Sequence, residues 1–334
     1  MRPLVLLSVL LLALTGCGSG SKDEPAAASS AGGAFPVTIK NKYGDTVVKA
    51  APQRIVTVGL VEQDALLALG VVPVATTEWF GEKPGALFPW AKAKLGDGAV
   101  PQVLSDKDGL QFEKIAALRP DLIIGLYSGI TADDYRKLTA IAPTVAQPAG
   151  VPDYGVAWQD VARTVGQAVG KAPEADELVQ GIEGRFAAVR SEHPEFKGRT
   201  ALMASPYQGY FVYGTQDPRS RLLTDFGFSL PGGLDKVIGD RFGGNLSAER
   251  IGLLDVQALV WFPEKGGTAK LKADPLYRNL KVRTQARDIF IEEDNDDELY
   301  GATSFVSVLS LPTVLDQLVP KLAAAVDGNP ATNG

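Results

Sequence analysis

Residues 173–192 read PEADELVQGIEGRFAAVRSE, and this stretch decides how the rest of the chain is organised. Pro173 suits the first turn of a helix, where its missing N–H removes no hydrogen bond. A continuous helix over this stretch would be about 30 Å long. Just upstream, apolar side chains recur at helical spacing at Trp158, Val161, Val165 and Val169. We therefore predict a helical connecting region over residues 156–198.

Strand and helix patterns alternate on the N-terminal side of this region. Residues 54–59 (RIVTVG) form a buried-strand pattern closed by glycine, and residues 62–69 have helical spacing that ends at Gly70. The alternation then continues as strand, helix, strand, helix and strand at 72–76, 112–118, 122–124, 132–141 and 144–146. Such alternation predicts a parallel sheet covered by helices, and we assign residues 37–155 to this first lobe.

The same kind of pattern resumes on the C-terminal side. It predicts strands at 201–204, 211–213, 258–262 and 289–292, a helix at 221–226, and a long final helix over 305–326. We assign residues 199–328 to a second lobe and residues 329–334 to a disordered tail. At 334 residues the chain exceeds the usual size of one domain. The predicted fold class is therefore α/β, with two α/β lobes that contain central sheets and are joined by a single long α-helix.

One short unit occurs in both predicted lobes. Residues 113–118 (EKIAAL) precede one strand, and residues 249–254 (ERIGLL) precede another. The acids Glu113 and Glu249 both fall in the first turn of a predicted helix, where the helix dipole stabilises a carboxylate by about 0.3–1 kcal/mol. That effect explains a single copy. Two copies at equivalent places raise a second hypothesis, that the two acids share a function.

The N-terminus has the anatomy of a secretory signal. Arg2 is followed by a leucine-rich run that ends in LTGC at residues 14–17, too short for a permanent membrane span. The small residues closing on Cys17 resemble the bacterial lipobox, which implies that this cysteine is acylated and becomes the mature N-terminus. An ordinary signal peptide that happens to contain a cysteine is the alternative. We predict a signal peptide at 1–16 and a lipidated flexible tether at 17–36, whose Gly, Ser and Ala cannot form a core.

The whole pattern resembles the substrate-binding lipoproteins of iron siderophore ABC importers, a group that also includes cobalamin and haem binders. The resemblance runs from about Arg54 to Val326. It is carried by the stretches RIVTVG, FEKIAALRPDLII, LSAERI and DPLYRNLK at 54–59, 112–124, 246–251 and 274–281. The resemblance implies that Glu113 and Glu249 pair with arginines of a membrane permease dimer. Val256-Gln257 stands where the family has Pro-Asp, which weakens the match of the second lobe.

The predicted ligand site follows from the sheets. Open parallel sheets bind ligands beyond the carboxyl ends of their strands, and those positions here are rich in rings and hydrogen-bond donors. The predicted ligand-binding residues are Trp79, Phe80, Tyr127, Ser128, Tyr207, Tyr210, Arg219, Arg241 and Trp261. Trp158 and Tyr213 are predicted to pack in the core instead. Aromatic walls with a few arginines suit a bulky chelate whose metal is already wrapped in oxygen ligands.

The number of arginines that face the cleft bears on the charge of the ligand. Arg219 and Arg221 are two residues apart, so they face different sides of any helix that contains both. Several inward arginines would favour an anionic chelate, whereas one would favour a neutral hydroxamate. The sequence leaves this choice open.

These observations predict a monomeric protein held by a lipid anchor at the extracytoplasmic face of the cell membrane. It captures a ferric siderophore between its lobes and delivers it to an ABC permease; haem or cobalamin binding by the same fold is the alternative. A nucleic-acid partner is not predicted, because the net charge is −6 and no basic stripe accompanies it.

Cofactors, direct metal ligands and catalytic residues are not predicted either. The chain has one histidine, His193, and one cysteine, so a soft or borderline metal site lacks its ligands. The sequence contains no G-x-S-x-G elbow, and no phosphate-binding or dinucleotide-binding glycine loop follows a predicted strand. An envelope hydrolase and a protein-binding scaffold are therefore the less favoured hypotheses.

Overall fold

The computed structural model describes residues 34–78, 83–105, 107–239, 241–293, 297–329 and 331–332. The predicted signal peptide and Cys17 lie outside these residues. We call residues 37–155 the N-lobe and residues 199–328 the C-lobe. Among the described residues, no helix combines the length and the apolar composition that a membrane span needs.

The N-lobe contains a five-stranded parallel sheet in the order β5-β4-β3-β6-β7. Its strands are β3 (Ile55–Thr57), β4 (Ala75–Thr77), β5 (Gln102–Leu104), β6 (Leu122–Gly125) and β7 (Thr144–Ala146). Its helices are α1 (Glu62–Ala68), α2 (Pro89–Leu95), α3 (Phe112–Ala117) and α4 (Ala132–Thr139), with the short 3₁₀ helix η1 at Pro84–Ala86. The three central strands are buried along most of their length, as expected for a parallel sheet covered on both faces.

An antiparallel hairpin that the sequence patterns did not reveal precedes this sheet. It consists of β1 (Val37–Asn41) and β2 (Gly44–Val48), paired from Val37 with Val48 to Asn41 with Gly44. The N–H of Lys42 in its turn donates to the carbonyl of Gln147, just beyond β7. The hairpin therefore lies against one edge of the N-lobe.

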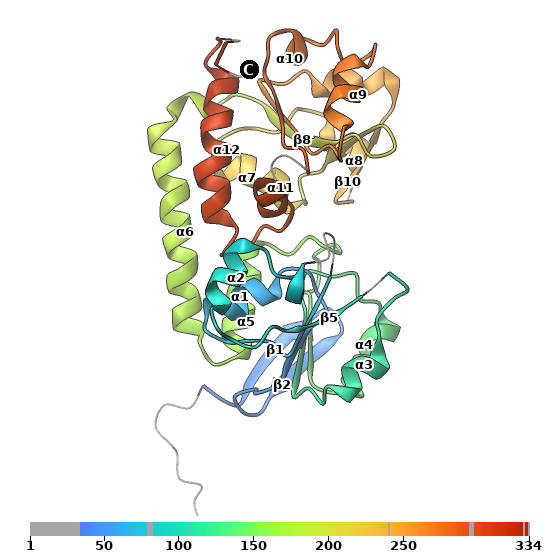
Figure 1. The fold of residues 1–334 in the computed structure, drawn as a ribbon, viewed down its shortest axis with the longest axis vertical. Helices are drawn as coiled ribbons and strands as arrows, with labels where there is room; N and C mark the ends of the chain where they lie inside the picture. The colour runs from blue at the N-terminus through green and yellow to red at the C-terminus, as the bar shows by residue number, and fades with distance from the viewer. Residues whose placement is uncertain are drawn as a thin grey trace, which may run out of the picture. The chain divides into compact units, whose positions relative to one another are not determined.

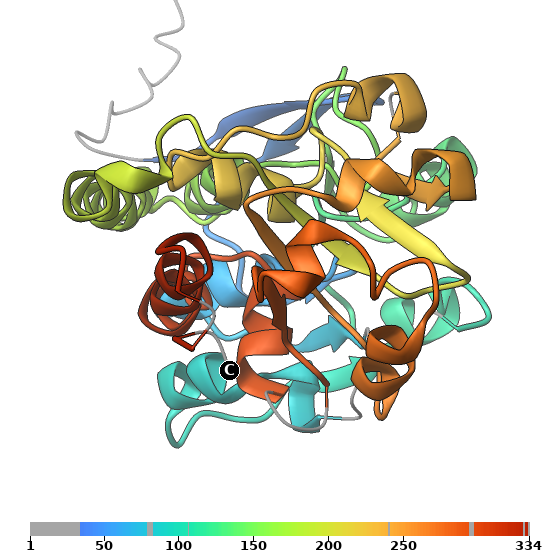
Figure 2. The same cartoon turned by 90° about the horizontal axis from the view of Figure 1, so that it is seen from above.

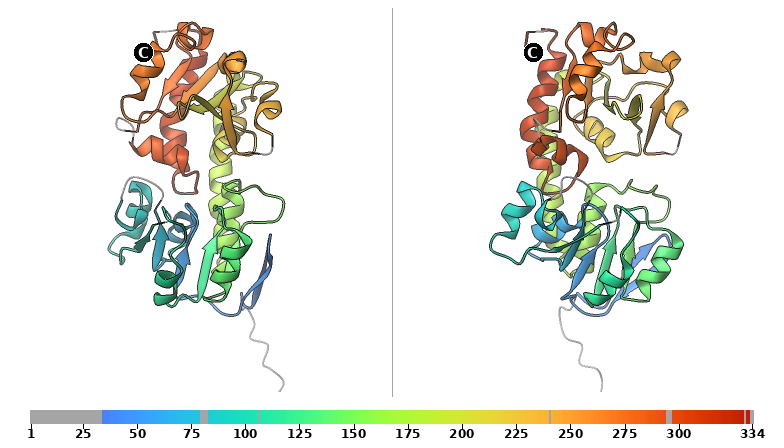
Figure 3. Two further views of the ribbon diagram at one scale, coloured as in Figure 1. Left: turned by 90° about the vertical axis from the view of Figure 1, so that its right-hand side faces the viewer. Right: turned by 45° about the vertical axis from the view of Figure 1, so that its right-hand side comes forward.

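The connecting region contains α5 (Trp158–Ala168), the long helix α6 (Ala172–Glu192) and the 3₁₀ helix η2 (Pro194–Phe196). Pro173 stands in the first turn of α6, as predicted. Figure 3 shows α6 running from the N-lobe into the C-lobe. The predicted architecture of two α/β lobes joined by one long helix is confirmed (Figure 1).

The C-lobe sheet is mixed, in the order β10-β9-β8-β11-β12. Its strands are β8 (Ala201–Ser205), β9 (Tyr210–Tyr213), β10 (Gly243–Leu246), β11 (Ala258–Trp261) and β12 (Asp288–Phe290). Strands β8, β11 and β12 are parallel, whereas β9 runs antiparallel to both β8 and β10. Only residues 206–209 connect β8 to β9, and so short a loop can join antiparallel strands but cannot cross over between parallel ones.

Several short helices surround this sheet, and one predicted helix is corrected. They are α7 (Pro218–Asp225), α8 (Leu234–Ile238), η3 (Ala248–Leu254), α9 (Gly267–Ala273), α10 (Lys281–Thr284) and α11 (Asp297–Ser304). The predicted final helix over 305–326 begins only at Leu311, as α12 (Leu311–Val326). Ser307 Oγ accepts from the N–H of Ser310, and Ser310 Oγ donates to the carbonyl of Phe305. These side-chain hydrogen bonds stabilise a turn at residues 305–310, where the sequence predicts the start of the helix.

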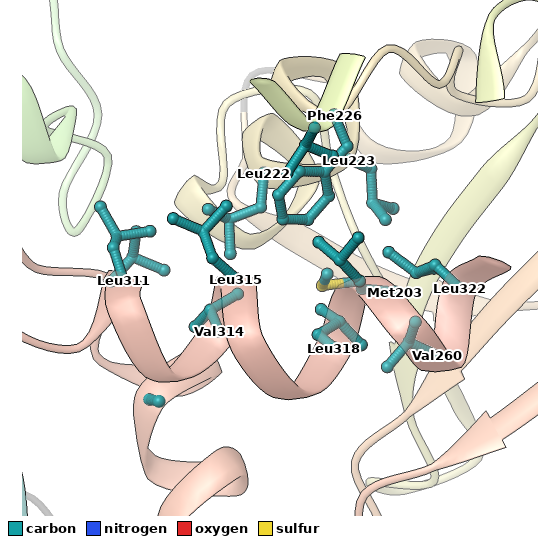
Figure 4. Packing of buried hydrophobic residues seen from close by; sticks show 14 of the residues in the cluster. Met203, Leu222, Leu223, Phe226, Val260, Leu311, Val314, Leu315, Leu318 and Leu322 are labelled. Atoms are coloured by element: carbon teal, nitrogen blue, oxygen red, sulfur yellow. The ribbon is translucent and has the colours of Figure 1, made fainter. Parts of the chain in front are cut away.

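Helix α12 connects the C-lobe core to the long helix α6. Figures 1 and 2 show the two helices side by side, and Arg185 of α6 forms an ion pair of 2.6 Å with Asp316 of α12. The inner face of α12 carries buried leucines and valines that pack with α7 and with the strands β8 and β11 (Figure 4). One continuous apolar core therefore joins α6, α12 and the C-lobe sheet.

Candidate ligand-binding site between the lobes

Both lobes line a pocket of about 570 Å³. Its lining residues are Pro152, Asp153 and Tyr154 from the N-lobe and Phe211, Arg241, Phe242, Gly243, Gly244 and Asn245 from the C-lobe. Phe242 is 40% exposed, and its ring centroid lies 5.8 Å from that of Phe211. Aromatic rings from both lobes therefore line this pocket.

Tyr154 also lines a smaller hollow of about 200 Å³ within the N-lobe. This hollow lies beyond the carboxyl ends of β3 and β6, where Val58, Leu60, Ser128, Gly129 and Ile130 follow the strands. A Cβ at Gly129 would lie 3.2 Å from the hydroxyl of Tyr154, so a glycine there leaves room for the ring. The position agrees with the rule that open parallel sheets bind ligands at this edge.

The loop that carries Tyr127 and Ser128 is held by a buried carboxylate. Glu62, in the first turn of α1, accepts hydrogen bonds at Oε1 from the backbone N–H groups of Leu126 and Tyr127, at 2.5 and 2.7 Å. Its Oε2 accepts from the N–H of Val61. Burial raises the pKa of Glu62 to about 7, although these N–H donors favour the charged form.

Tyr127 and Ser128 therefore occupy defined positions at the end of β6. The hydroxyl of Ser128 donates to the carbonyl of Gly125 at 2.8 Å. Tyr127 is buried, and its ring meets that of Tyr154 edge-on at a centroid distance of 5.7 Å. Burial raises the pKa of the Tyr127 hydroxyl, so it stays protonated.

Arg219 lies on the C-lobe side of the same junction and is paired with Asp217. The carboxylate of Asp217 accepts from Nε and Nη2 of Arg219, both at 2.8 Å, and the two side chains are 0% and 8% exposed. The guanidinium lies 3.9 Å from the ring centroid of Tyr213. Burial opposes the charge of Arg219, but Asp217 raises its pKa above the ordinary value. The two charges act in opposite directions on the buried Tyr127 hydroxyl, whose pKa burial raises: Arg219 lowers that pKa and Asp217 raises it.

The other two arginines have different surroundings. Arg221 donates through Nη1 to the carbonyl of Gly155 and through Nη2 to that of Gln216, at 2.8 and 2.6 Å. Arg241 is exposed and donates through Nε to the carbonyl of Ile238 at 3.1 Å. Arg241 lines the inter-lobe pocket, and Arg221 lines a second pocket of about 470 Å³ to which both lobes also contribute.

The prediction for Trp261 is corrected by the structure. Trp261 is 0% exposed in a core cluster, and its Nε1 donates to the hydroxyl of Tyr277 at 2.8 Å. Successive side chains of a strand point to opposite faces of its sheet. The next residue, Phe262, therefore points to the face where Tyr213 and Tyr300 lie, with ring centroids about 6 Å away.

Tyr207 and Tyr210 line a different pocket, which is about 610 Å³ and is lined by C-lobe residues. Tyr207 is 56% exposed, and the hydroxyl of Tyr210 donates to Asp274 at 2.7 Å. Tyr210 and Phe211 are consecutive in β9, so their side chains leave opposite faces of the sheet. The structure thus places Arg241 in the lining of the inter-lobe pocket and Ser128 in that of the N-lobe hollow, whereas Tyr127 and Arg219 are buried. Tyr207 and Tyr210 line the separate C-lobe pocket. Trp79 and Phe80 lie outside the described residues.

Sequence reasoning did not include three aromatic residues of the inter-lobe site: Tyr154, Phe211 and Phe242. Tyr154 lies in a turn rich in glycine and proline (GVPDYG, residues 150–155) after β7, so its place past a strand was a usable signal. Phe211 lies within a strand, and four residues do not show which side chains point to which face of the sheet.

Among the described residues, no group of three or more His, Cys, Asp and Glu side chains is arranged to hold a metal ion.

The two repeated acids occupy matching local positions. Glu113 is exposed in the first turn of α3, and Glu249 is exposed in the first turn of η3. The second element is a 3₁₀ helix, and both acids lie in the first turn of a helix as predicted. Exposure leaves both carboxylates accessible to a partner.

The chain is similar in sequence to several known binding proteins. The chain is 27% identical over 293 residues to the probable siderophore-binding lipoprotein YfiY of Bacillus subtilis (strain 168), covering 83% of this chain and 86% of that protein. It is 30% identical over 205 residues to the Fe(3+) dicitrate-binding periplasmic protein FecB of Escherichia coli (strain K12), covering 59% and 63%.

Solved structures of binding proteins are also similar to this chain over most of its length. A periplasmic solute binding protein from Mycobacterium smegmatis is 39% identical, with a TM-score of 0.76 over 87% of this chain and 98% of that one. PiaA of Streptococcus pneumoniae, solved in complex with ferrichrome, is 26% identical with a TM-score of 0.76 over 87% and 99%. The family model described as periplasmic binding protein matches residues 55–287. Because that match spans most of both lobes and the helix between them, the chain belongs to the periplasmic binding protein family.

Proposed function

We propose that this protein captures a ferric siderophore between its lobes and delivers it to the permease of an ABC importer. The observation that carries the proposal is a pocket to which both lobes contribute rings, Tyr154 from the N-lobe and Phe211 and Phe242 from the C-lobe. Relatives that match most of this chain are named for siderophore binding, and one solved relative holds ferrichrome. An aromatic pocket with few charged groups suits a bulky organic chelate better than a bare ion.

The protein's own part in this function is to enclose the chelate and leave the iron–ligand bonds intact. The iron arrives with its coordination sphere already filled by siderophore oxygens, so the protein has to contact only the outside of the complex. Aromatic faces cover the apolar linkers, and Arg241 offers directed N–H donors to the oxygens. Release then needs no change in the chelate itself.

Delivery is proposed to use Glu113 and Glu249. Both acids are exposed, one on each lobe, and would each contact one of two equivalent basic surfaces of the permease. Charge complementarity of this kind orients two partners and accelerates their encounter. The resemblance to siderophore importers supplies the partner, and the repeated sequence unit supplies the two positions.

Anchoring is proposed to depend on Cys17 and the tether at 17–36. A flexible chain of this length reaches roughly 25 Å, which would keep the lobes near the membrane that holds the permease. Two of the Bacillus subtilis relatives are named as lipoproteins. The proposed location is therefore the extracytoplasmic face of the cell membrane.

A titration tests the proposed function. We expect saturable quenching of tryptophan fluorescence when ferric siderophores are added to the protein, with one site per chain. Haem and cobalamin are titrated in parallel. Tight binding of either, together with no saturable response to hydroxamate, catecholate or mixed chelates, would replace the proposal with that alternative.

A further inference from the structure

The charges around the inter-lobe pocket are balanced, and this bears on the class of chelate. We propose, on the basis of the proposed function, that the ligand is an electrically neutral ferric trihydroxamate and not an anionic catecholate or citrate complex. Three hydroxamates carry one negative charge each and neutralise Fe³⁺. Three catecholates carry two each, so their ferric complex keeps a charge of −3, and ferric dicitrate is likewise an anion.

The inventory of cations in the folded part is complete. The internal residues outside the description, 79–82, 106, 240 and 294–296, read WFGE, D, D and DND and contain no lysine or arginine. Every lysine and arginine from residue 34 onward is therefore described. Among the residues that line the inter-lobe pocket and the adjoining N-lobe hollow, Arg241 is the one cation. A second pocket lined by both lobes, of about 470 Å³, contains Arg221 together with the acids Asp160 and Asp225, so it has no net positive charge.

The same two cavities contain two acids. Asp153 lines the inter-lobe pocket and pairs with Lys42 at 3.0 Å. Asp134 lines the N-lobe hollow and accepts hydrogen bonds from the backbone N–H and hydroxyl of Thr131. Because Lys42 neutralises Asp153, Arg241 and Asp134 remain and cancel, so the two cavities have no net positive charge to attract or hold an anion.

Arg219 does not change this balance. Both carboxylate oxygens of Asp217 are bound to its guanidinium, and the pair is almost fully buried. An ion pair of this kind presents no net charge to a ligand, and separating it would leave a buried carboxylate unpaired at high cost. The C-lobe pocket is balanced as well, because Lys265 and Lys270 accompany Glu264 and Asp274.

A neutral chelate fits what remains. Its apolar linkers can lie against the rings of Phe211, Phe242 and Tyr154, and its hydroxamate oxygens can accept from Arg241. An anion with a charge of −3 would lose its hydration in the same pocket without meeting compensating cations, which is unfavourable.

The first test compares affinities and their salt dependence. Ferrichrome serves as the neutral probe, and ferric dicitrate and a ferric tricatecholate serve as anionic probes, titrated by tryptophan quenching at 50 and 500 mM NaCl. We expect ferrichrome to bind at least about 100-fold more tightly than either anion. We also expect its Kd to change less than about twofold with salt, because screening weakens only charge-dependent binding.

The second test adds charge to the pocket. Asn245 is exposed in β10 and lines the inter-lobe pocket, so Asn245→Lys introduces a cation there with little risk to folding. The variant Asp217→Asn instead removes the partner of Arg219 and keeps an oxygen at the start of α7. Each should raise the affinity for ferric dicitrate relative to ferrichrome by about 10-fold or more. The control Asp316→Asn makes the same charge change on α12, beside α6, and should leave this ratio unchanged.

The outcomes separate this inference from the function on which it rests. Tighter binding of an anionic chelate, or equal binding of both classes, overturns the inference and keeps the proposed function. An affinity ratio that does not respond to Asn245→Lys also overturns it. If no ferric chelate of any charge binds, the proposed function itself fails.

Discussion

Glu62 shows how one buried side chain sets the geometry of the site. Its carboxylate accepts hydrogen bonds from the backbone on both sides of the junction between α1 and the end of β6. The loop that carries Tyr127 and Ser128 is thereby fixed to the N-terminus of α1. The charge is buried, and burial raises the pKa of Glu62 to about 7 from an ordinary value of 4.5.

This pKa predicts a pH dependence of stability. Below pH 4.5 the group is protonated in both states and contributes nothing. Between pH 4.5 and 7 the folded state binds more protons than the unfolded state, so stability falls as pH rises. Relative to Glu62→Gln, the wild type should lose about 3 kcal/mol of unfolding free energy between pH 4 and pH 8. Urea unfolding at a series of pH values measures this, and parallel pH profiles of the two proteins would contradict it.

The repeated acids give a second prediction at this scale. Changing both Glu113 and Glu249 to Arg should leave siderophore affinity unchanged and abolish uptake, because like charges at an interface cost several kcal/mol. The alternative role, support of the helix dipole, is worth at most about 1 kcal/mol per acid. Radiolabelled iron uptake in cells measures the difference.

Glu174 supplies a matched control for that experiment. It is also an exposed acid in the first turn of a helix, α6, but it has no counterpart in the repeated unit. Glu174→Arg should transport iron at the normal rate. Normal uptake by the double variant would refute the docking role.

Residue positions were predictable from the sequence where the chain leaves a strand. Tyr127 and Ser128 follow the apolar run of β6, and the rule for open sheets places them at the lobe junction without further information. Trp261 was misassigned and Phe211 was omitted because both lie inside short strands. There the choice of face depends on the register of the sheet, which a four-residue strand does not specify.

At the scale of elements, the turn between α11 and α12 connects the lobes. Asp64 of α1 accepts hydrogen bonds at Oδ2 from Nε1 of Trp90 and from the hydroxyl of Ser307, at 2.7 and 2.5 Å. The Ser307 hydroxyl also accepts from the N–H of Ser310 and so defines where α12 begins. One serine thus delays the start of the final helix and forms a hydrogen bond between the C-lobe and the N-lobe.

Ser307→Ala should therefore lower the free energy of unfolding markedly, although it removes only one hydroxyl. It removes a hydrogen bond to a buried carboxylate, which is worth about 1.5–3 kcal/mol. Thr313→Ala, in the first turn of the same helix, removes a hydroxyl with a contact of 3.5 Å to Glu298 and should cost less than about 0.5 kcal/mol. Urea unfolding of both variants checks the prediction, and equal stabilities would contradict it.

The alternation of strands and helices made most of the elements predictable. The predicted helices at 62–69, 112–118 and 132–141 correspond to α1, α3 and α4, because apolar spacing and glycine or proline breaks mark their ends. The mixed order of the C-lobe sheet was not predicted, because alternation does not distinguish a crossover from a hairpin. The loop length between β8 and β9 does distinguish them.

At the scale of the whole molecule, the lobes are joined by a continuous helix and share a buried contact. Helix α6 runs unbroken from Ala172 to Glu192 and packs along α12 through an apolar core. Large closing motions require hinge residues that absorb changes of backbone angle, and a packed helix interior offers none. The inter-lobe pocket is therefore expected to be largely formed before the ligand arrives.

Small-angle X-ray scattering tests that expectation. The radius of gyration with and without a saturating ferric siderophore should differ by less than about 1 Å. A large compaction on binding would mean that α6 bends or that the contact between Asp64 and Ser307 breaks.

The central claim is that the iron complex lies between the lobes, against Tyr154, Phe211 and Phe242. Anomalous diffraction at the iron absorption edge, from crystals of the protein grown with a ferric siderophore, locates the metal directly. The account predicts one strong peak in the inter-lobe pocket, near Tyr154 and Phe242 and away from any histidine or cysteine. A peak in the C-lobe pocket beside Tyr207 and Lys270, or iron bound directly by protein side chains, would contradict it.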